Sequence, residues 1–182
     1  MPDRTDATAS PEGRARRPAV GARLLDPEAR LQHARDLAWG ALARRDRTVA
    51  ELRTILAGKR VEPELIAQVV QEVAKQGYLD DERYARVFAE DRRRLDGWGT
   101  ERIERRLLGL GVAPQTVAAA VGGRSAEAEL EAALDLLRRR APAPARTPLE
   151  RDRQLRLLLR RGYASELAYD AVRRHARVSV ED

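Results

Sequence analysis

The sequence predicts an all-α protein built from three tandem three-helix repeats, and three observations carry this prediction. Its 182 residues include only two Trp, four Tyr and one Phe, so Leu, Ala and Val must fill the interior, and this mixture favours helices. Apolar residues recur at helical spacing along most of the chain. The pattern also repeats, because Leu56, Leu107 and Leu158 follow one another at intervals of 51 residues.

Segments without an apolar period set the expected boundaries. The first 24 residues mix Pro and Gly with charged residues, so we expect a disordered tail there. The prolines of 141–148 cannot lie inside a helix and indicate an extended connector. The predicted organisation is an N-terminal tail (1–24), repeat 1 (25–77), repeat 2 (78–122), repeat 3 (123–177) with the Pro-rich connector, and a C-terminal tail (178–182).

The first repeat contains signals for three helices. Helical spacing continues to Arg45, and a second helix begins at Thr48 with Glu51 three residues later. This pair is typical of a capping box, in which each side chain accepts a hydrogen bond from the other residue's backbone N–H. Pro63 opens a third helix, and Gly77 suits the position just past its end.

The second repeat shows the same order of signals. Asp80 can cap its first helix, and Leu79 can pack against Tyr84 one turn into that helix. The Gly97-Trp98-Gly99 turn leads into the middle helix, which Gly111 ends. The residues expected to face inward from the first helix are Tyr84, Val87, Phe88 and Leu95.

The third repeat is less regular than the other two. The connector interrupts its first part, and Gln154 occupies the position that is apolar in the other repeats, where Leu52 and Ile103 stand. We therefore expect the packing of this repeat to differ from that of the other two.

Several function classes are excluded by what the chain lacks. Without cysteine it can form neither disulfides nor thiolate metal sites. His33 and His175 show no partner spacing typical of a metal site or a catalytic triad, and we place both on helix surfaces. We expect no enzyme activity, catalytic residue, metal or cofactor. The chain has no apolar stretch that could span a bilayer and no signal-peptide core, which predicts a cytoplasmic protein without membrane contact.

Four segments together carry a family resemblance. The most specific is Gly77–Ala85, with the sequence GYLDDERYA, followed by Gly97–Gly99 and the run Ile103–Val112. Leu42–Leu52 adds a match in the first repeat. In this order the segments resemble the RecX family of bacterial regulators of the RecA recombinase, and the resemblance extends over about Pro27–Arg177.

The resemblance implies both a shape and a function. The family fold is an elongated stack of three-helix repeats, curved to the right or to the left, that lies along a RecA filament on single-stranded DNA. Such a protein modulates, and mainly inhibits, the ATPase, strand-exchange and coprotease activities of RecA. The expected partner is the RecA filament, with single- or double-stranded DNA as a second partner through a basic face, and we expect a monomer.

Arginines are the candidate binding residues, since all but two of the 35 basic residues are arginine. Arg102, Arg105 and Arg106 share one helix face, and Arg153 and Arg156 follow Arg102 and Arg105 by one 51-residue period. Stacked repeats would align them in one basic strip. Three further features complete the candidate set: the arginine run at the end of one helix, the tryptophan in the turn after it, and an arginine one helical turn after Arg156. The full set is Arg92, Arg93, Arg94, Trp98, Arg102, Arg105, Arg106, Arg153, Arg156 and Arg160.

The sequence leaves the ligand of this strip open. Arginine suits both DNA phosphates and the carboxylates of an acidic protein surface. The alternative function is therefore an independent, sequence-nonspecific nucleic-acid-binding helical repeat. Arginines at helix ends are also explained by the helix dipole alone. Tyr78 and Trp98, both in turns, either cover the edge of a core or project toward a partner.

Overall fold

The computed structural model describes residues 26–178, and this part of the chain contains helices and no strands. The tails predicted at 1–24 and 178–182 lie outside it, apart from Val178 at the end of the last helix. The helices of the described part are α1 (Pro27–Leu42), α2 (Val49–Gly58), α3 (Pro63–Lys75), α4 (Asp81–Asp96), α5 (Thr100–Gly109), α6 (Pro114–Val121), α7 (Ala126–Arg140), α8 (Pro148–Arg161) and α9 (Ser165–Val178).

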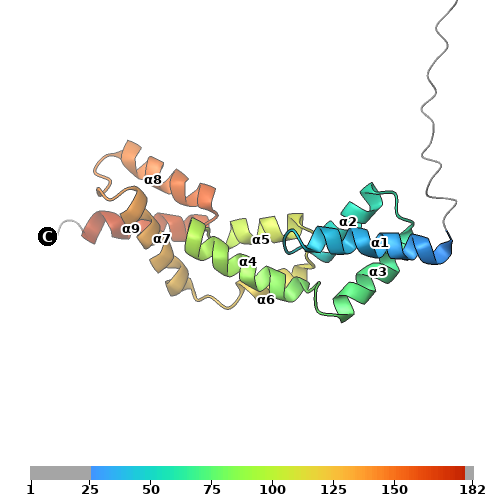
Figure 1. Cartoon of the computed structure of the whole chain (residues 1–182). Helices are drawn as coiled ribbons and strands as arrows, with labels where there is room; N and C mark the ends of the chain where they lie inside the picture. Colours follow the sequence, from blue (N-terminus) through green and yellow to red (C-terminus); the bar gives the residue numbers. More distant parts are fainter. Residues whose placement is uncertain (1–25, 179–182) are drawn as a thin grey trace, which may run out of the picture.

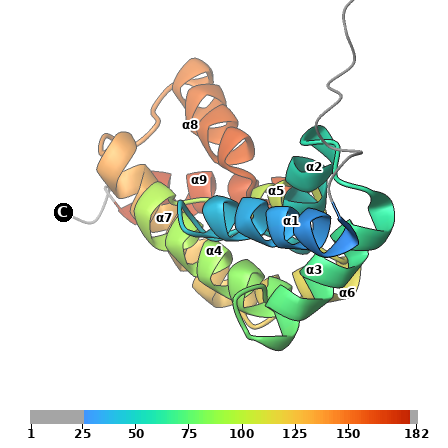
Figure 2. The same cartoon turned by 45° about the vertical axis from the view of Figure 1, so that its right-hand side comes forward.

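The helices form three units, α1–α3, α4–α6 and α7–α9, because most of their contacts lie within these groups. Each unit has its own cluster of buried apolar residues. The units follow one another along the molecule and give it an elongated shape (Figure 1). In the third unit α8 packs on α9 rather than on α7, and it stands out from the stack in Figure 2. The predicted all-α stack of three tandem three-helix repeats is confirmed.

The 51-residue period describes the core. Leu56, Leu107 and Leu158 lie on the middle helices α2, α5 and α8 of the three units, and each is fully buried. Burying a leucine side chain contributes about 1.5–3 kcal/mol. The capping box predicted for the start of α2 is also present, with Thr48 and Glu51 in their expected roles. The period therefore marks equivalent core positions.

The inward face of α4 differs from the prediction. Ala85 and Ala89 are buried, with Tyr84 and Phe88 half-buried beside them. Val87 and Leu95 are 49% and 65% exposed, so their predicted inward position is wrong. The physical reason is that α4 turns its alanine side toward α6. Small side chains let two helices approach closely, and the stripe that contains Val87 then faces solvent.

Buried polar side chains hold the Pro-rich connector, and they correct a second prediction. His175 on α9 is 6% exposed rather than on the surface, and its Nε2 lies 2.9 Å from the carbonyl oxygen of Ala141. Gln154 on α8 is 5% exposed and donates from Nε2 to the carbonyl oxygen of Ala143 at 3.0 Å. The connector has carbonyl groups that no helix satisfies, so these side chains replace the missing backbone donors.

The three middle helices run head to tail in the order α8, α5, α2. At the α2–α5 junction the Thr48 hydroxyl donates to the carbonyl oxygen of Leu110 at 2.7 Å. At the α5–α8 junction, one period later, the Gly99 N–H donates to the carbonyl oxygen of Arg161 at 2.8 Å. Each C-terminal helix end thus faces the N-terminal end of the next helix. The free carbonyl groups at one helix end accept hydrogen bonds from the next helix end, from a hydroxyl at the first junction and from N–H groups at the second, and the helix dipoles align.

An acidic side chain from the following unit completes each junction. The Val49 N–H donates to a carboxylate oxygen of Asp81 at 2.9 Å. One period later the Thr100 N–H donates to a carboxylate oxygen of Glu129 at 2.8 Å. Both carboxylates lie at the N-terminal end of a middle helix, where negative charge is favourable. Units are therefore joined by polar contacts at helix ends as well as by apolar packing.

Left-handed backbone recurs at this period just after each middle helix. Arg60, Gly111 and Gly162 stand 51 residues apart, and their φ angles are 63°, 78° and 85°. A Cβ atom on Gly162 would lie 2.3 Å from the Cβ of Arg102, and one on Gly111 would lie 2.3 Å from the Cβ of Ala50. These two positions lie at unit junctions and have no room for a side chain. Arg60 lies just past the end of α2, which is the last helix in the head-to-tail order. No junction is formed there among the described residues, so a side chain fits at some cost in backbone strain.

Candidate interaction surface

Five of the ten candidate residues come together at the α5–α8 junction. Trp98, Arg102, Arg105, Arg106 and Arg160 line one shallow hollow, which we call the basic hollow. The first four come from α5 and the turn before it, and Arg160 comes from the end of α8. Head-to-tail docking of the two helices brings Arg160 beside residues more than 50 positions earlier.

Trp98 lines the basic hollow and connects it to the core of the second unit. Its ring is half-buried and packs against the core of the second unit. The guanidinium carbon of Arg102 lies 4.2 Å from the ring centroid, and that of Arg92 lies 5.7 Å from it. A cation over an indole face contributes about 0.5–1 kcal/mol at an exposed site. The ring thus both covers a core edge and positions arginines, and Arg102 already occupies one of its faces.

Arg102 also has a structural role. Its guanidinium donates to the carbonyl oxygen of Arg160 at 2.7 Å, and its Cβ lies against Gly162. The equivalent residue of the first unit is Glu51, so the fold of that unit needs no arginine at this position, whereas the second unit uses Arg102 for these contacts. Both the stem and the head of Arg102 help to hold α8 against α5.

The other arginines of the basic hollow keep their charges unpaired within the described residues. Arg105, Arg106 and Arg160 are exposed, and their guanidinium groups have no carboxylate or carbonyl partner there. Arg153 and Arg156 are also exposed, farther along α8, and Arg156 pairs with Asp152. The surface therefore offers a concentrated group of cations at the junction and a weaker extension along α8.

The run Arg92–Arg94 does not form one cluster. Only Arg92 lies beside Trp98, and it also pairs with Asp96. Arg93 donates to the carbonyl oxygen of Val121 at 3.0 Å, and burial lowers the pKa of its guanidinium. Arg94 pairs with Asp91 at 3.3 Å. Consecutive helical residues point about 100° apart, so a run of three cannot share one surface.

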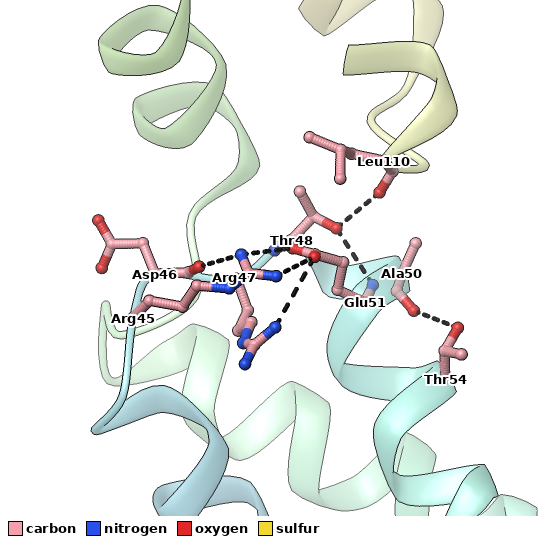
Figure 3. Close-up of polar contacts among 8 residues, drawn as sticks. All are labelled: Arg45, Asp46, Arg47, Thr48, Ala50, Glu51, Thr54 and Leu110. Carbon is pink, nitrogen blue, oxygen red and sulfur yellow. Dashed lines mark hydrogen bonds and ion pairs between the residues drawn. The ribbon is translucent and has the colours of Figure 1, made fainter. Parts of the chain in front are cut away.

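A second hollow lies at the α2–α5 junction, and sequence reasoning missed it. Its lining includes Arg47, Glu51, Thr54, Ile55 and Gly109. Figure 3 shows the start of α2 at this place, with Thr48 bridging to Leu110 and Thr54 bonded to the carbonyl oxygen of Ala50. The available signal was the 51-residue period, which aligns the lining of this hollow with that of the basic hollow.

Glu51 makes this second hollow close to neutral. Its carboxylate accepts from Arg45 at 2.6 Å and from the Thr48 N–H at 3.2 Å, and Arg47 lies 3.9 Å away (Figure 3). Burial raises the pKa of the Glu51 carboxyl, but the hydrogen bonds from Arg45 and Thr48 outweigh it and leave the pKa below the ordinary glutamate value. We call this site the neutral hollow.

An exposed aromatic pair lies elsewhere on the surface. Tyr78 is 59% exposed and meets Trp39 edge-on, with ring centroids 4.8 Å apart. Of the two turn aromatics left open by the sequence, Tyr78 therefore projects into solvent, whereas Trp98 covers a core edge. Within residues 26–178 no group of three or more His, Asp or Glu side chains could hold a metal ion. No described helix could cross a membrane.

The fold and its junctions define the class of the protein: a tandem three-helix-repeat protein that carries an arginine-lined hollow between its second and third units. Comparison with known families gives the same arrangement. Residues 34–72 match the family model described as RecX, first three-helix domain, and residues 80–121 match RecX, second three-helix domain.

Individual relatives and solved structures agree with these matches. The regulatory protein RecX of Deinococcus radiodurans is 34% identical over 185 residues, which cover 100% of this chain and 86% of that protein. That of Thermobifida fusca is 35% identical over 81% of this chain and 80% of its own. The crystal structure of RecX from Lactobacillus salivarius superposes with a TM-score of 0.72 at 15% identity, covering 83% of this chain and 99% of that one. The chain belongs to the RecX family of regulatory proteins.

Proposed function

We propose that the protein binds RecA and its filament on single-stranded DNA and restrains the ATPase, strand-exchange and coprotease activities of that filament. Membership of the RecX regulatory family supports the choice of partner. The observation that carries the choice of surface is the basic hollow, where Arg105, Arg106 and Arg160 present unpaired cations on an elongated array of repeats. We further propose that it acts as a cytoplasmic monomer, without catalysis or a cofactor.

Arginines without local partners favour a binding role over a purely structural one. An exposed arginine that only balances a helix dipole needs no concave surrounding. Here the cations converge from two helices of different units, so they face the same ligand together. A group of this kind attracts an acidic surface over a distance of about 10 Å at ordinary salt.

Nucleic-acid binding without a protein partner is the second candidate function. The same cations could neutralise phosphates. However, Arg102 covers one face of the Trp98 ring, so the aromatic residue of this surface offers little area for stacking on a base. This observation favours contacts with charged groups over recognition of single-stranded bases.

A titration into preformed RecA filaments tests the proposed function. ATP hydrolysis by RecA should fall as the protein is added at constant single-stranded DNA, up to equimolar ratios. Adding further free DNA should leave the inhibition in place, because the protein acts on RecA. Recovery of ATPase activity in proportion to free DNA would instead show that the protein only competes for DNA.

Charge reversal tests the surface. We expect the triple variant R105E/R106E/R153E to weaken inhibition by about tenfold or more, since attraction becomes repulsion. Arg102 is left unchanged in this variant, because it holds α8 in place. The matched control R44E/K59E/R86E makes the same change of charge at exposed positions outside both hollows. Equal inhibition by both folded variants would reject the surface.

A further inference from the structure

The basic and neutral hollows are the same site in two copies. Each lies where the N-terminal end of one middle helix meets the C-terminal end of the next. Adding one 51-residue period to five residues of the neutral hollow gives the complete lining of the basic hollow. The pairs are Arg47 with Trp98, Glu51 with Arg102, Thr54 with Arg105, Ile55 with Arg106, and Gly109 with Arg160.

The two copies differ in charge and polarity. The basic hollow has four arginines and no acidic residue in its lining. In the neutral hollow Arg47 and Glu51 offset one another, and the remaining residues are small or aliphatic: Ala50, Thr54, Ile55, Gly109, Leu110 and Gly111. The two hollows lie one repeat apart in the stack, and their linings therefore suit different ligands: an anion at the basic hollow and an uncharged group at the neutral hollow.

We propose that the two hollows form one two-point docking surface for a protein partner, in which the basic hollow takes carboxylate side chains and the neutral hollow takes an uncharged, aliphatic side chain. This inference rests on the proposed function, which supplies RecA as the partner. It adds the chemistry of the two contact points and their separation by one repeat.

The difference in charge between the two hollows favours a protein ligand over a nucleic acid. A nucleic-acid backbone presents a phosphate at every nucleotide, so a strand that follows the junctions would meet equal demand for cations at both. At the neutral hollow it would meet the Glu51 carboxylate, whose nearest cations are already engaged. A polypeptide can place acidic and aliphatic side chains at different points along one surface, and guanidinium groups match carboxylates in a two-bond geometry.

Trp98 provides a direct probe of the basic hollow. In a W39F background Trp98 is the only tryptophan, so its fluorescence reports on this site. Hexaglutamate should change the emission in a saturable way and bind about tenfold more weakly to the R105E/R106E variant of that background. Hexathymidylate should bind more weakly than hexaglutamate. Equal or tighter binding of the oligonucleotide would overturn the assignment of a protein ligand, while the effect on RecA ATPase would still stand.

A gain of charge tests the neutral hollow. The double variant T54R/G109R copies Arg105 and Arg160 into it. A side chain fits at Gly109, because a Cβ there has no neighbour within 4 Å, and Thr54 is exposed. We expect inhibition of RecA to weaken by about fivefold, because the uncharged group of the partner would meet two cations. The paired variant T54Q/G109Q adds similar bulk without charge, and we expect it to weaken inhibition less than T54R/G109R does, because only the two cations are absent.

The remaining outcomes of this experiment decide against the inference. Unchanged inhibition by T54R/G109R would show that the neutral hollow makes no contact. Stronger inhibition would show that both hollows take anions, as a nucleic-acid backbone would require. Both results assume that the unmodified protein inhibits RecA in the same assay. If it does not, the proposed function fails first, and the two failures are thereby distinguished.

Discussion

The α2–α5 and α5–α8 junctions have the same backbone architecture and different side chains. In each, the N-terminal end of a middle helix packs on a carbonyl group and a left-handed glycine of the next unit. An acidic side chain of that unit accepts a hydrogen bond from an N–H group of the helix end. The residues that line the hollow beside this docking contact have changed from mostly neutral to mostly arginine. Backbone contacts can therefore maintain the stack while the exposed lining of a junction carries a different binding chemistry.

The largest expected effect comes from blocking one junction. Gly162→Ala should lower the free energy of unfolding by about 4 kcal/mol, because the new Cβ would lie 2.5 Å from the Arg102 backbone nitrogen at a φ of 85°. Urea unfolding followed by circular dichroism measures this loss. Arg60→Gly is the control, since Arg60 has the same backbone conformation without a junction beside it. A loss below about 1 kcal/mol for Gly162→Ala would show that the junction adapts.

The next effect compares the central unit with the third. Leu107→Ala should cost about 3–4 kcal/mol and Leu158→Ala about 2–3 kcal/mol. Both side chains are fully buried at equivalent positions, but the second unit has a neighbour on each side, while α8 packs mainly on α9. Thermal unfolding of both variants measures the difference. Equal losses, or a greater loss for Leu158→Ala, would contradict the central role of the second unit.

A smaller effect on the free energy of unfolding comes from the charge of Glu51 in the neutral hollow. Glu51→Gln keeps the capping geometry and removes the ion pairs with Arg45 and Arg47, which should cost about 1 kcal/mol at pH 7. The pKa of Glu51 is lowered in the folded protein, so its contribution is complete above the ordinary value of about 4.3 and is lost as the pH falls through the lowered pKa.

Unfolding experiments at pH 7 and pH 3 check this dependence. The difference between the original protein and Glu51→Gln should shrink at the lower pH. Glu90→Gln, at an exposed residue of α4, should show little difference at either pH. A Glu51→Gln difference that stays constant with pH would mean that its cause is packing rather than charge.

The smallest effect concerns the irregular third unit. Gln154→Leu restores the apolar residue found at the equivalent positions of the other units, and it removes a buried Oε1 that has no hydrogen-bond partner in the described structure. It also removes the bond to the carbonyl oxygen of Ala143. These terms oppose one another, so stability should change by less than about 0.5 kcal/mol. A loss above about 2 kcal/mol, measured by urea unfolding, would show that the connector depends on Gln154.

Local signals made much of the fold predictable. Thr48 with Glu51, Pro63 and the glycines at helix ends act through bonds to residues a few positions away, so a reader of the sequence can place them. Predictions failed where the outcome depended on a distant element. Val87 and Leu95 are apolar at helical spacing, yet α6 packs on the alanine side of α4. His175 is buried because the connector returns over it.

The candidate site shows the same division. The sequence by itself determined the period, the three-helix units, the family resemblance and the presence of arginines on the outer face of α5, because each follows from spacing along one chain segment. Only the tertiary structure decided that the candidate Arg160 lies beside these arginines, that the candidate Arg93 turns away to bond Val121, and that Arg102 supports a junction. Docking between helix ends more than 50 residues apart sets those positions, and the spacing of residues within one helix carries no information about such contacts.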